Sequence, residues 1–352
     1  MQQIAIFTQN LDIGGVQKRV SEISDFLSKF YRVYIILAED NKQIKYKLNS
    51  KIKTLKIKTK KINISKKFAG EKVFKYRVEA LEKFLKKIKP KVVLSFEDYN
   101  NLILLKTKTK TKKIVSVRVS FDMYKGKKIH LLDESFYKKV KKLYAKTKKI
   151  IVVSQAIKKQ LKNSLLIYNG VEIKECKEQK FSNYILNVGR LHPQKGQIDL
   201  IKAFNKIKSK IKENLIIVGD GVLKNELKKL IKELNLEDRV KLTGYDDPYK
   251  YYKNAELFVF PSYYEGHPNA LLEAMKCGCA VVSYDFSGSD EILDKRVRVG
   301  DVENLSKEIL KVLKNNDIAE SLKLKSKEIV KKYSYHKSLR KYKEVVDRCV
   351  VY

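Results

Sequence analysis

The sequence of 352 residues contains no apolar run long enough to cross a membrane as a helix, and it has little cysteine. A membrane-spanning helix needs about 20 consecutive apolar residues, so this absence argues against helical spans. The first residues lead directly into an expected strand and lack the basic start and apolar stretch of a secretion signal. We therefore expect the chain to reside in the cytoplasm.

Four cysteines, at positions 176, 277, 279 and 349, are too few and too scattered for a disulfide framework. Only one residue separates Cys277 from Cys279, whereas zinc knuckles need two or more, so we interpret this pair as packing at a helix end. No Asp-x-Asp sequence and no complete Gly-x-Gly-x-x-Gly fingerprint occurs. We expect neither a metal nor a cofactor.

Acidic residues are also scarce, since 40 Asp and Glu stand against 77 Lys and Arg, giving a net charge of +37. Residues 1–175 hold 43 basic and 15 acidic residues, and only 10 of all the basic residues are Arg. Three interpretations stay open: a lysine-biased composition with solvated helix faces, sequence-blind attraction to nucleic acid, and attraction to an anionic membrane surface. The asymmetry favours the membrane over pure composition, and we expect no specific nucleic-acid partner.

Short apolar runs alternate with helical patterns along the whole chain, which predicts an α/β fold with parallel sheets. The expected strands are 4–8, 33–38, 52–64, 92–96, 114–119, 150–154, 184–188, 215–218, 240–243, 257–261 and 280–284. Helices are expected from Gln17 and over residues 71–89. A polar, aperiodic stretch, 172–182, separates two series of strands. We therefore predict two Rossmann-like doubly wound domains, 1–172 and 173–335, followed by a helical segment, 336–352.

The most informative segment covers residues 261–278. Pro268 suits the first turn of a helix because its missing N–H would be unpaired there anyway, and Gly278 suits the helix stop. Glu265 before the helix and Glu273 inside it could accept hydrogen bonds from sugar hydroxyls. The alternative without a ligand is that Glu265 caps the helix and Glu273 is an ordinary exposed helical side chain. The first backbone N–H groups of the helix would form an anion site for a diphosphate, at Asn269, Ala270 and Leu271.

The spacing Glu265-x7-Glu273 after a Pro-Ser strand end resembles the signature of the retaining family 4 glycosyltransferases, also called glycosyl transferases group 1, which have the GT-B fold. In that family the first glutamate contacts the transferred sugar, and the second holds the ribose hydroxyls. The resemblance also implies that Gly266 and His267 line the donor site. The stretches 278–283 and 288–292 are similar to the usual continuation of the family.

Arg190 and Lys195 follow an expected buried strand and resemble the basic loop that grips the donor diphosphate in this family. Two fixed cations would stabilise the charge of the leaving nucleoside diphosphate without a metal. With Glu265 they form the expected catalytic set, although both could be ordinary surface charges in so basic a protein. Gly219 and Tyr245 resemble the next turn and the base-binding edge of the donor site.

The pair Gly14-Gly15 resembles the glycine loop that lies beside the acceptor and donor phosphates in the family. Adjacent glycines let a backbone approach a ligand closely, so we expect Gly15 on the donor side and Gly14 on the acceptor side. Many relatives carry a histidine after the strand at 114–119, where this chain has Arg118. Because arginine cannot act as a base, Arg118 is expected to bind an acceptor phosphate, unless the register differs.

The pattern over residues 219–252 is most similar to bacterial enzymes that add N-acetylhexosamines to lipid-linked oligosaccharides. The resemblance implies a GT-B architecture, in which two domains face a central cleft and the C-terminal helix returns to the first domain. It further implies transfer of a hexose or N-acetylhexosamine from a UDP-sugar, with α linkage, to a polyprenyl-diphosphate oligosaccharide or lipopolysaccharide core. We expect this reaction at the inner face of the cytoplasmic membrane.

Two other functions stay open. A sugar-nucleotide epimerase of the same fold would keep the nucleotide site but would need added acid and base residues. A basic nucleic-acid-binding protein would need only the positive charge.

Overall fold

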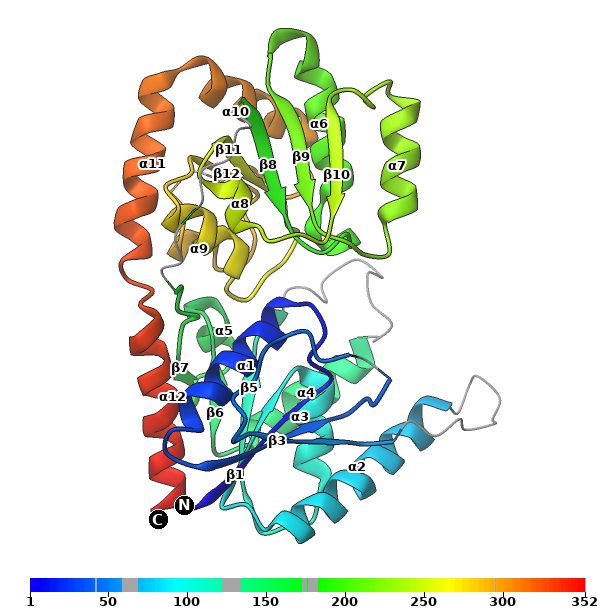
Figure 1. The fold of residues 1–352 in the computed structure, drawn as a ribbon, viewed down its shortest axis with the longest axis vertical. Coiled ribbons are helices and arrows are strands. Elements are labelled where there is room, and N and C mark those ends of the chain that lie inside the picture. The colour runs from blue at the N-terminus through cyan, green and yellow to red at the C-terminus, as the bar shows by residue number, and fades with distance from the viewer. Residues whose placement is uncertain are drawn as a thin grey trace. The chain divides into compact units, whose positions relative to one another are not determined.

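The computed structural model describes residues 1–41, 43–58, 69–121, 134–172, 176, 183–294 and 296–351. The chain forms two compact units, which Figure 1 shows with the chain coloured from blue to red. The first unit comprises Met1–Arg118, Leu132–Tyr168 and His336–Tyr352, and the second comprises Val119–Leu131 and Asn169–Tyr335. The predicted domain limits at residues 172 and 335 stay predictions. The compact units are defined by contacts within each unit and not by what each unit binds.

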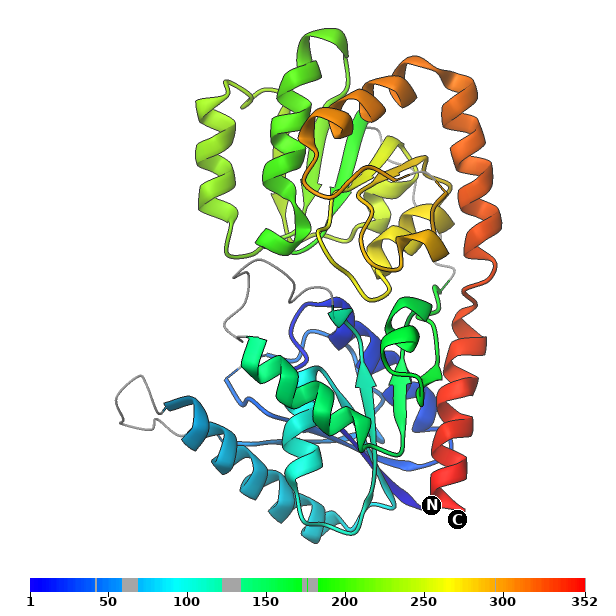
Figure 2. The same cartoon turned by 180° about the vertical axis from the view of Figure 1, so that it is seen from behind.

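The first unit is built on a seven-stranded parallel sheet of order β3-β2-β1-β4-β5-β6-β7. Strands β1 and β4 are buried almost throughout, as expected of parallel strands covered on both faces. Helix α1 is in front of this sheet in Figure 1, and α3 and α4 are in front in Figure 2. The elements are β1 (Gln3–Thr8), α1 (Gly15–Leu27), β2 (Arg32–Leu37), β3 (Lys53–Lys56), α2 (Ala69–Ile88), β4 (Val92–Phe96), α3 (Asp98–Lys106), β5 (Lys112–Val117), α4 (Glu134–Ala145), β6 (Ile150–Val152), α5 (Gln155–Gln160), β7 (Leu165–Leu166) and α12 (Tyr335–Val350).

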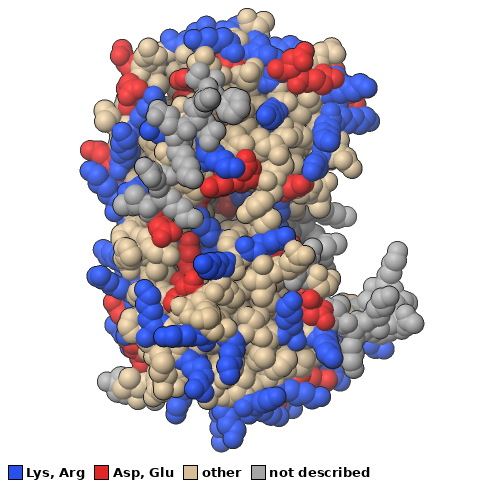
Figure 3. Space-filling model, viewed as in Figure 1, with Lys and Arg blue, Asp and Glu red and all other residues tan. Residues whose placement is uncertain are grey.

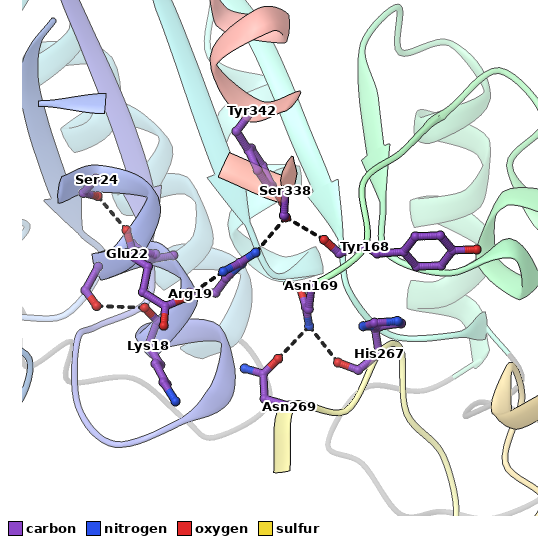
Figure 4. Close-up of polar contacts among 12 residues, drawn as sticks. Lys18, Arg19, Glu22, Ser24, Tyr168, Asn169, His267, Asn269, Ser338 and Tyr342 are labelled. Carbon is purple, nitrogen blue, oxygen red and sulfur yellow. Dashed lines mark hydrogen bonds and ion pairs between the residues drawn. The ribbon is translucent and has the colours of Figure 1, made fainter. Parts of the chain in front are cut away.

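Helix α12 is tied into the first unit by a buried polar network (Figure 4). Arg19 on α1 is only 1% exposed, and its guanidinium pairs with Glu22 at 2.8 Å. The same guanidinium donates to the Ser338 hydroxyl at 2.7 Å, and Ser338 donates to the Tyr168 carbonyl at 2.6 Å. A buried charge is tolerated only when it is paired, so this network fixes the start of α12 against α1.

The second unit is built on a five-stranded parallel sheet of order β10-β9-β8-β11-β12. Helices α6, α7 and α10 cover one face with a continuous aliphatic core, and α8 and α9 are on the side that faces the viewer in Figure 1. The elements are β8 (Tyr184–Val188), α6 (Gln197–Ile207), β9 (Asn214–Val218), α7 (Lys224–Glu233), β10 (Val240–Gly244), α8 (Tyr249–Tyr252), β11 (Ala255–Phe260), α9 (Asn269–Lys276), β12 (Val281–Ser283), α10 (Val302–Lys314) and α11 (Asn316–Val330).

Both sheets have the doubly wound order, in which the first strand lies in the interior and the chain then winds in the two opposite directions. The direction reverses between β1 and β4 in the first unit and between β8 and β11 in the second. Loops at the carboxyl ends of such strand pairs, called topological switch points, form the usual ligand sites of this architecture. The predicted α/β class with two parallel sheets is confirmed.

Several predicted elements differ from the structure in their limits. Helix α1 begins two residues before the predicted start at Gln17. The strand expected within residues 52–64 is present as β3, over Lys53–Lys56, and residues 59–64 of that prediction lie outside the described residues. Within the part of the chain that the structure describes, no helix is both long and apolar enough to span a membrane.

The expectation that the cysteines only pack was wrong for one pair. Cys176 and Cys277, which are 101 residues apart, form a disulfide. Cysteine spacing could not show this bridge, because the fold alone brings the two residues together. Cys279 does pack at the helix end: it is buried, its thiol donates to the Tyr252 carbonyl at 3.0 Å, and burial raises its pKa to about 12.

Asp98, the first residue of α3, makes folding sensitive to pH. Burial raises the pKa of its carboxyl to about 6, although the Tyr144 hydroxyl donates to it at 2.7 Å. The folded state therefore holds this proton more tightly than the unfolded chain, so the stability contributed by this group is greatest at low pH and falls as the pH rises through about 6.

We expect the free energy of unfolding of Asp98→Asn to exceed that of the wild type by about 1–3 kcal/mol at about pH 7. At about pH 4 we expect the two free energies of unfolding to be equal. Urea unfolding of both proteins at the two pH values measures the difference. An equal difference in unfolding free energy at both pH values would contradict the raised pKa of Asp98.

Candidate active site

The loops at the carboxyl edge of the second sheet lie closer together than any side chain would allow. Gly219, after β9, has φ 147°, and a Cβ there would lie 2.0 Å from the Gly189 carbonyl oxygen. Gly196, after β8, has φ 65°, and a Cβ there would lie 2.1 Å from the Pro261 carbonyl oxygen. These glycines bring the loops after β8, β9 and β11 into backbone contact at the switch point of the unit.

Lys195 and Glu265 join the two loops of this switch point. The Lys195 Nζ lies 2.5 Å from the Glu265 Oε1 and 5.5 Å from the centre of the Phe260 ring. Glu265 is 8% exposed, so water screens the pair weakly. The structure thus brings two of the predicted catalytic residues together, with one fixed cation and one hydroxyl-accepting carboxylate side by side.

Arg190, the third predicted catalytic residue, is exposed in the loop after β8. Its carbonyl accepts a hydrogen bond from the buried Gln197 side chain at 3.0 Å, which fixes the loop. Burial, followed by the charge of Glu265, raises the pKa of Tyr264, and the charge of Arg190 opposes this rise. The guanidinium is therefore close enough to act on the same loop as Glu265.

Helix α9 begins at Asn269, and Pro268 precedes it with an extended ψ of 115°. The prediction that Pro268 lies in the first turn was wrong by one residue, because its backbone is not helical. Pro268, the residue before the helix, makes no capping side-chain hydrogen bond. The N–H groups of Asn269, Ala270 and Leu271 stay predicted hydrogen-bond donors to an anion.

The predicted stop of α9 at Gly278 is confirmed. Gly278 has φ 84°, which an L side chain adopts only with strain. Its N–H donates to the Met275 carbonyl at 3.1 Å, and the N–H of Cys279 donates to the Ala274 carbonyl at 3.0 Å. This pair of bonds is the Schellman motif.

Glu273 is only 6% exposed, which excludes the interpretation of an ordinary exposed helical side chain. The buried Tyr252 hydroxyl on α8 donates to Glu273 Oε2 at 3.2 Å. Burial and then the negative charge of Glu273 raise the pKa of Tyr252. Tyr252 was not among the predicted site residues, and its signal in the sequence was the aromatic run at 249–252.

Asn169 was also missed, although it holds the loop between the two glutamates (Figure 4). Its side-chain amide donates to the His267 carbonyl at 2.7 Å and to the Asn269 Oδ1 at 2.9 Å. The His267 ring packs edge-on against Tyr333, with centroids 4.7 Å apart. The sequence signal for Asn169 was the Asn-Gly pair at 169–170, which directly precedes the expected end of the first domain at residue 172.

The remaining predicted donor residues are dispersed. Gly266 is buried in the same loop as Glu265, whereas Tyr245 follows β10 and is 61% exposed. Gly15 begins α1 in the first unit. Their roles in donor binding stay predictions.

The two predicted acceptor residues have internal contacts in the first unit. Arg118 is 7% exposed, donates to the Tyr342 hydroxyl at 3.2 Å and lies 5.8 Å from the Phe96 ring centre. Desolvation by burial lowers its pKa. The Gly14 N–H donates to the Tyr46 hydroxyl at 3.0 Å. Acceptor binding by Gly14 and Arg118 stays a prediction.

The geometry defines a doubly wound unit with a cation–carboxylate pair at its switch point. Comparison with known proteins identifies the family of the chain. Residues 171–329 match the glycosyl transferases group 1 family. The chain is 31% identical over 310 residues to the N-acetylgalactosamine-N,N'-diacetylbacillosaminyl-diphospho-undecaprenol 4-alpha-N-acetylgalactosaminyltransferase of Campylobacter jejuni, covering 83% of each chain. The chain belongs to the glycosyl transferases group 1 and is a glycosyltransferase, as the resemblance implied.

Solved structures confirm the GT-B fold. The sucrose-phosphate synthase of Thermosynechococcus elongatus is similar with a TM-score of 0.84 at 18% identity, covering 99% of each chain. HepE of Anabaena, in complex with UDP and glucose, is similar with a TM-score of 0.76 at 15% identity, covering 99% of this chain and all of its own.

The contact between Gly219 and Gly189 can be tested by adding the missing Cβ. We expect Gly219→Ala to lower the unfolding free energy by about 2 kcal/mol or more, because the methyl group meets backbone that cannot move aside cheaply. Thermal and urea unfolding measure the change.

Gly70→Ala is the matched control, since a Cβ there meets nothing within 4 Å and the residue is helical in α2. This control should be neutral or stabilising by about 0.5–1 kcal/mol. Equal effects of the two substitutions would show that the contact is not tight.

Proposed function

We propose that the chain moves a hexose or N-acetylhexosamine from a UDP-sugar to a lipid-linked saccharide, with retention, α linkage and no metal ion. The observation that carries this proposal is the Lys195–Glu265 pair at the switch point of the second unit. The UDP and glucose in the complex of HepE support the donor class. The Campylobacter relative, named as acting on a diphospho-undecaprenol saccharide, supports the acceptor class.

In the proposed donor complex, the diphosphate lies between the cations of Lys195 and Arg190 and the amino end of α9. This arrangement neutralises the charge that grows on the leaving diphosphate, and such preorganised charge is a large source of catalysis. Glu265 accepts a hydroxyl of the transferred sugar, and Glu273 accepts the ribose hydroxyls. The loop that contains Gly266 and His267, and the positions Gly219 and Tyr245, line the nucleotide site.

The proposed reaction breaks the bond between the anomeric carbon and the β-phosphate oxygen of UDP. The acceptor hydroxyl oxygen forms the new bond on the same face of the sugar, and its proton passes to the leaving diphosphate. The transition state has oxocarbenium character, as in glycoside hydrolysis. Because the leaving group takes the proton, the proposal needs no strong protein base.

We expect the wild-type protein to release UDP from a UDP-hexose or UDP-N-acetylhexosamine when membrane lipid extract is present. Lys195→Gln should lower kcat by about 100-fold or more, because it removes charge stabilisation specific to the transition state. Lys202→Gln is the control, since Lys202 is an exposed lysine on α6 of the same unit. UDP and GDP release from a panel of sugar nucleotides measures both.

The panel also separates the alternatives. Release from GDP-sugars alone would contradict the UDP donor, and equal rates for Lys195→Gln and Lys202→Gln would contradict the site. An epimerase would convert the sugar nucleotide without net release. A protein that only binds nucleic acid would show no release, and Glu265→Ala would leave its function intact.

We also propose that the protein works at the anionic inner face of the cytoplasmic membrane. Lysine and arginine side chains are spread over the face shown in Figure 3, with acidic side chains between them. The excess of basic over acidic residues is concentrated in residues 1–175, which hold 43 basic and 15 acidic residues. Each lysine near an anionic leaflet contributes about 1 kcal/mol of attraction.

Sedimentation with vesicles tests this part. We expect binding to vesicles that contain phosphatidylglycerol and release at about 0.5 M salt, because salt screens the attraction. Vesicles of phosphatidylcholine alone are the control. Equal sedimentation with both vesicle types, or binding that salt does not change, would contradict the electrostatic proposal.

A further inference from the structure

The first unit has its own switch point, between β1 and β4, and a glutamate joins its two loops. Glu97 directly follows β4, and the loop after β1 runs from Gln9 to Gly15, which we call the glycine loop. This arrangement is analogous to the second unit, where Lys195 and Glu265 join the loops after β8 and β11. We propose that Glu97 is the positioning residue of the glycine loop and adapts it to a hydroxyl-bearing acceptor saccharide. The acceptor part of this inference rests on the proposed function.

The carboxylate of Glu97 contacts the chain on both sides of the glycine loop. Its Oε2 accepts from the Gln9 N–H at 3.2 Å and from the Thr8 hydroxyl at 3.4 Å. Its Oε1 accepts from the Gln17 side-chain amide at 3.3 Å. Because one rigid group binds the end of β1 and the first turn of α1, it sets the span of the loop between them.

Glu97 is held in its place at the cost of an unfavourable backbone conformation. Its φ is 73°, in the left-handed region that residues with a Cβ rarely adopt. The side chain of Asn100, which is 1% exposed, donates to Glu97 Oε2 at 3.1 Å and to the Phe96 carbonyl at 3.2 Å. Such conformations persist where the surroundings enforce them, commonly at functional sites.

The glycine loop is also fixed at Gly14. A Cβ at this position would lie 2.2 Å from the Gln17 Oε1, so the absent side chain leaves room for the amide that contacts Glu97. The Tyr46 hydroxyl accepts from the Gly14 N–H at 3.0 Å and donates to the Gly14 carbonyl at 2.9 Å. The space left by the absent Gly14 side chain is thus filled by Gln17, and the expected approach of Gly14 to a ligand stays a prediction.

The charge around the loop indicates which part of an acceptor it can bind. Glu39, after β2, accepts from the Gln9 side chain at 2.6 Å and from the Asn10 side chain at 3.1 Å. With Glu97, two carboxylates therefore hold the glycine loop. Arg77 pairs with the Glu39 carboxylate at 3.7 Å, so part of this negative charge is neutralised. Sugar hydroxyls can donate to carboxylate and side-chain amide oxygens. The polar groups that hold the glycine loop therefore suit the hydroxyls of an acceptor saccharide.

The test is Glu97→Gln, which keeps the shape of the side chain and removes its charge. The matched control is Glu82→Gln in the same unit. Glu82 also accepts a backbone N–H, from Lys108 at 3.1 Å, and pairs with Lys86 at 3.0 Å, but it lies on α2. For both variants we would measure initial rates against acceptor and donor concentration, UDP affinity by calorimetry, and hydrogen exchange of residues 9–17.

We expect Glu97→Gln to lower kcat/KM for the acceptor about 10- to 100-fold, with UDP affinity within twofold of wild type. Amides of residues 9–17 should exchange at least tenfold faster, and Glu82→Gln should change none of these values. A double-mutant cycle of Glu97→Gln with Gln17→Ala should be non-additive, because both substitutions break the same contact.

Unchanged exchange in Glu97→Gln, or an equal loss of donor and acceptor efficiency, would overturn the inference. If the wild-type protein transfers no sugar, the proposed function fails, and the exchange experiment still decides whether Glu97 positions the loop.

Discussion

Backbone contact between loops is the constraint on which the donor side of this protein depends. A carbonyl oxygen occupies the space where a Cβ of Gly219 or Gly196 would lie, so the loops after β8, β9 and β11 meet without intervening side chains. That proximity brings Lys195 to Glu265. Asn169 and the Schellman motif then hold the two ends of the segment that contains both glutamates. The chemistry of the site follows from this packing.

The two units use the same topological position with different charged groups. In the second unit a lysine and a glutamate meet at the switch point. In the first unit the carboxylates of Glu97 and Glu39 hold the corresponding loop, and Arg77 pairs with Glu39. The proposed reaction assigns the anionic leaving group to the switch point of the second unit and the hydroxyl-bearing acceptor to that of the first unit.

Residue patterns predicted the features that depend on local sequence, such as the buried strands and the stop at Gly278. The structure brings Glu265 and Lys195 side by side, and their catalytic roles stay predictions. Features that depend on distant partners could not be read in this way. Cys176 reaches Cys277 only through the fold, and the burial of Glu273 is clear only once Tyr252 packs beside it. The positive φ of Glu97 leaves no trace in the sequence, because glutamate is an ordinary residue after a strand.

A crystal structure of the protein with bound UDP tests the central claim most directly. The account predicts that the diphosphate lies within hydrogen-bonding distance of Lys195 and the first N–H groups of α9, with the ribose hydroxyls on Glu273. The Lys195 ammonium should then contact phosphate oxygen as well as Glu265. A diphosphate bound away from the β8/β11 switch point, with the Lys195–Glu265 pair unchanged, would contradict the account.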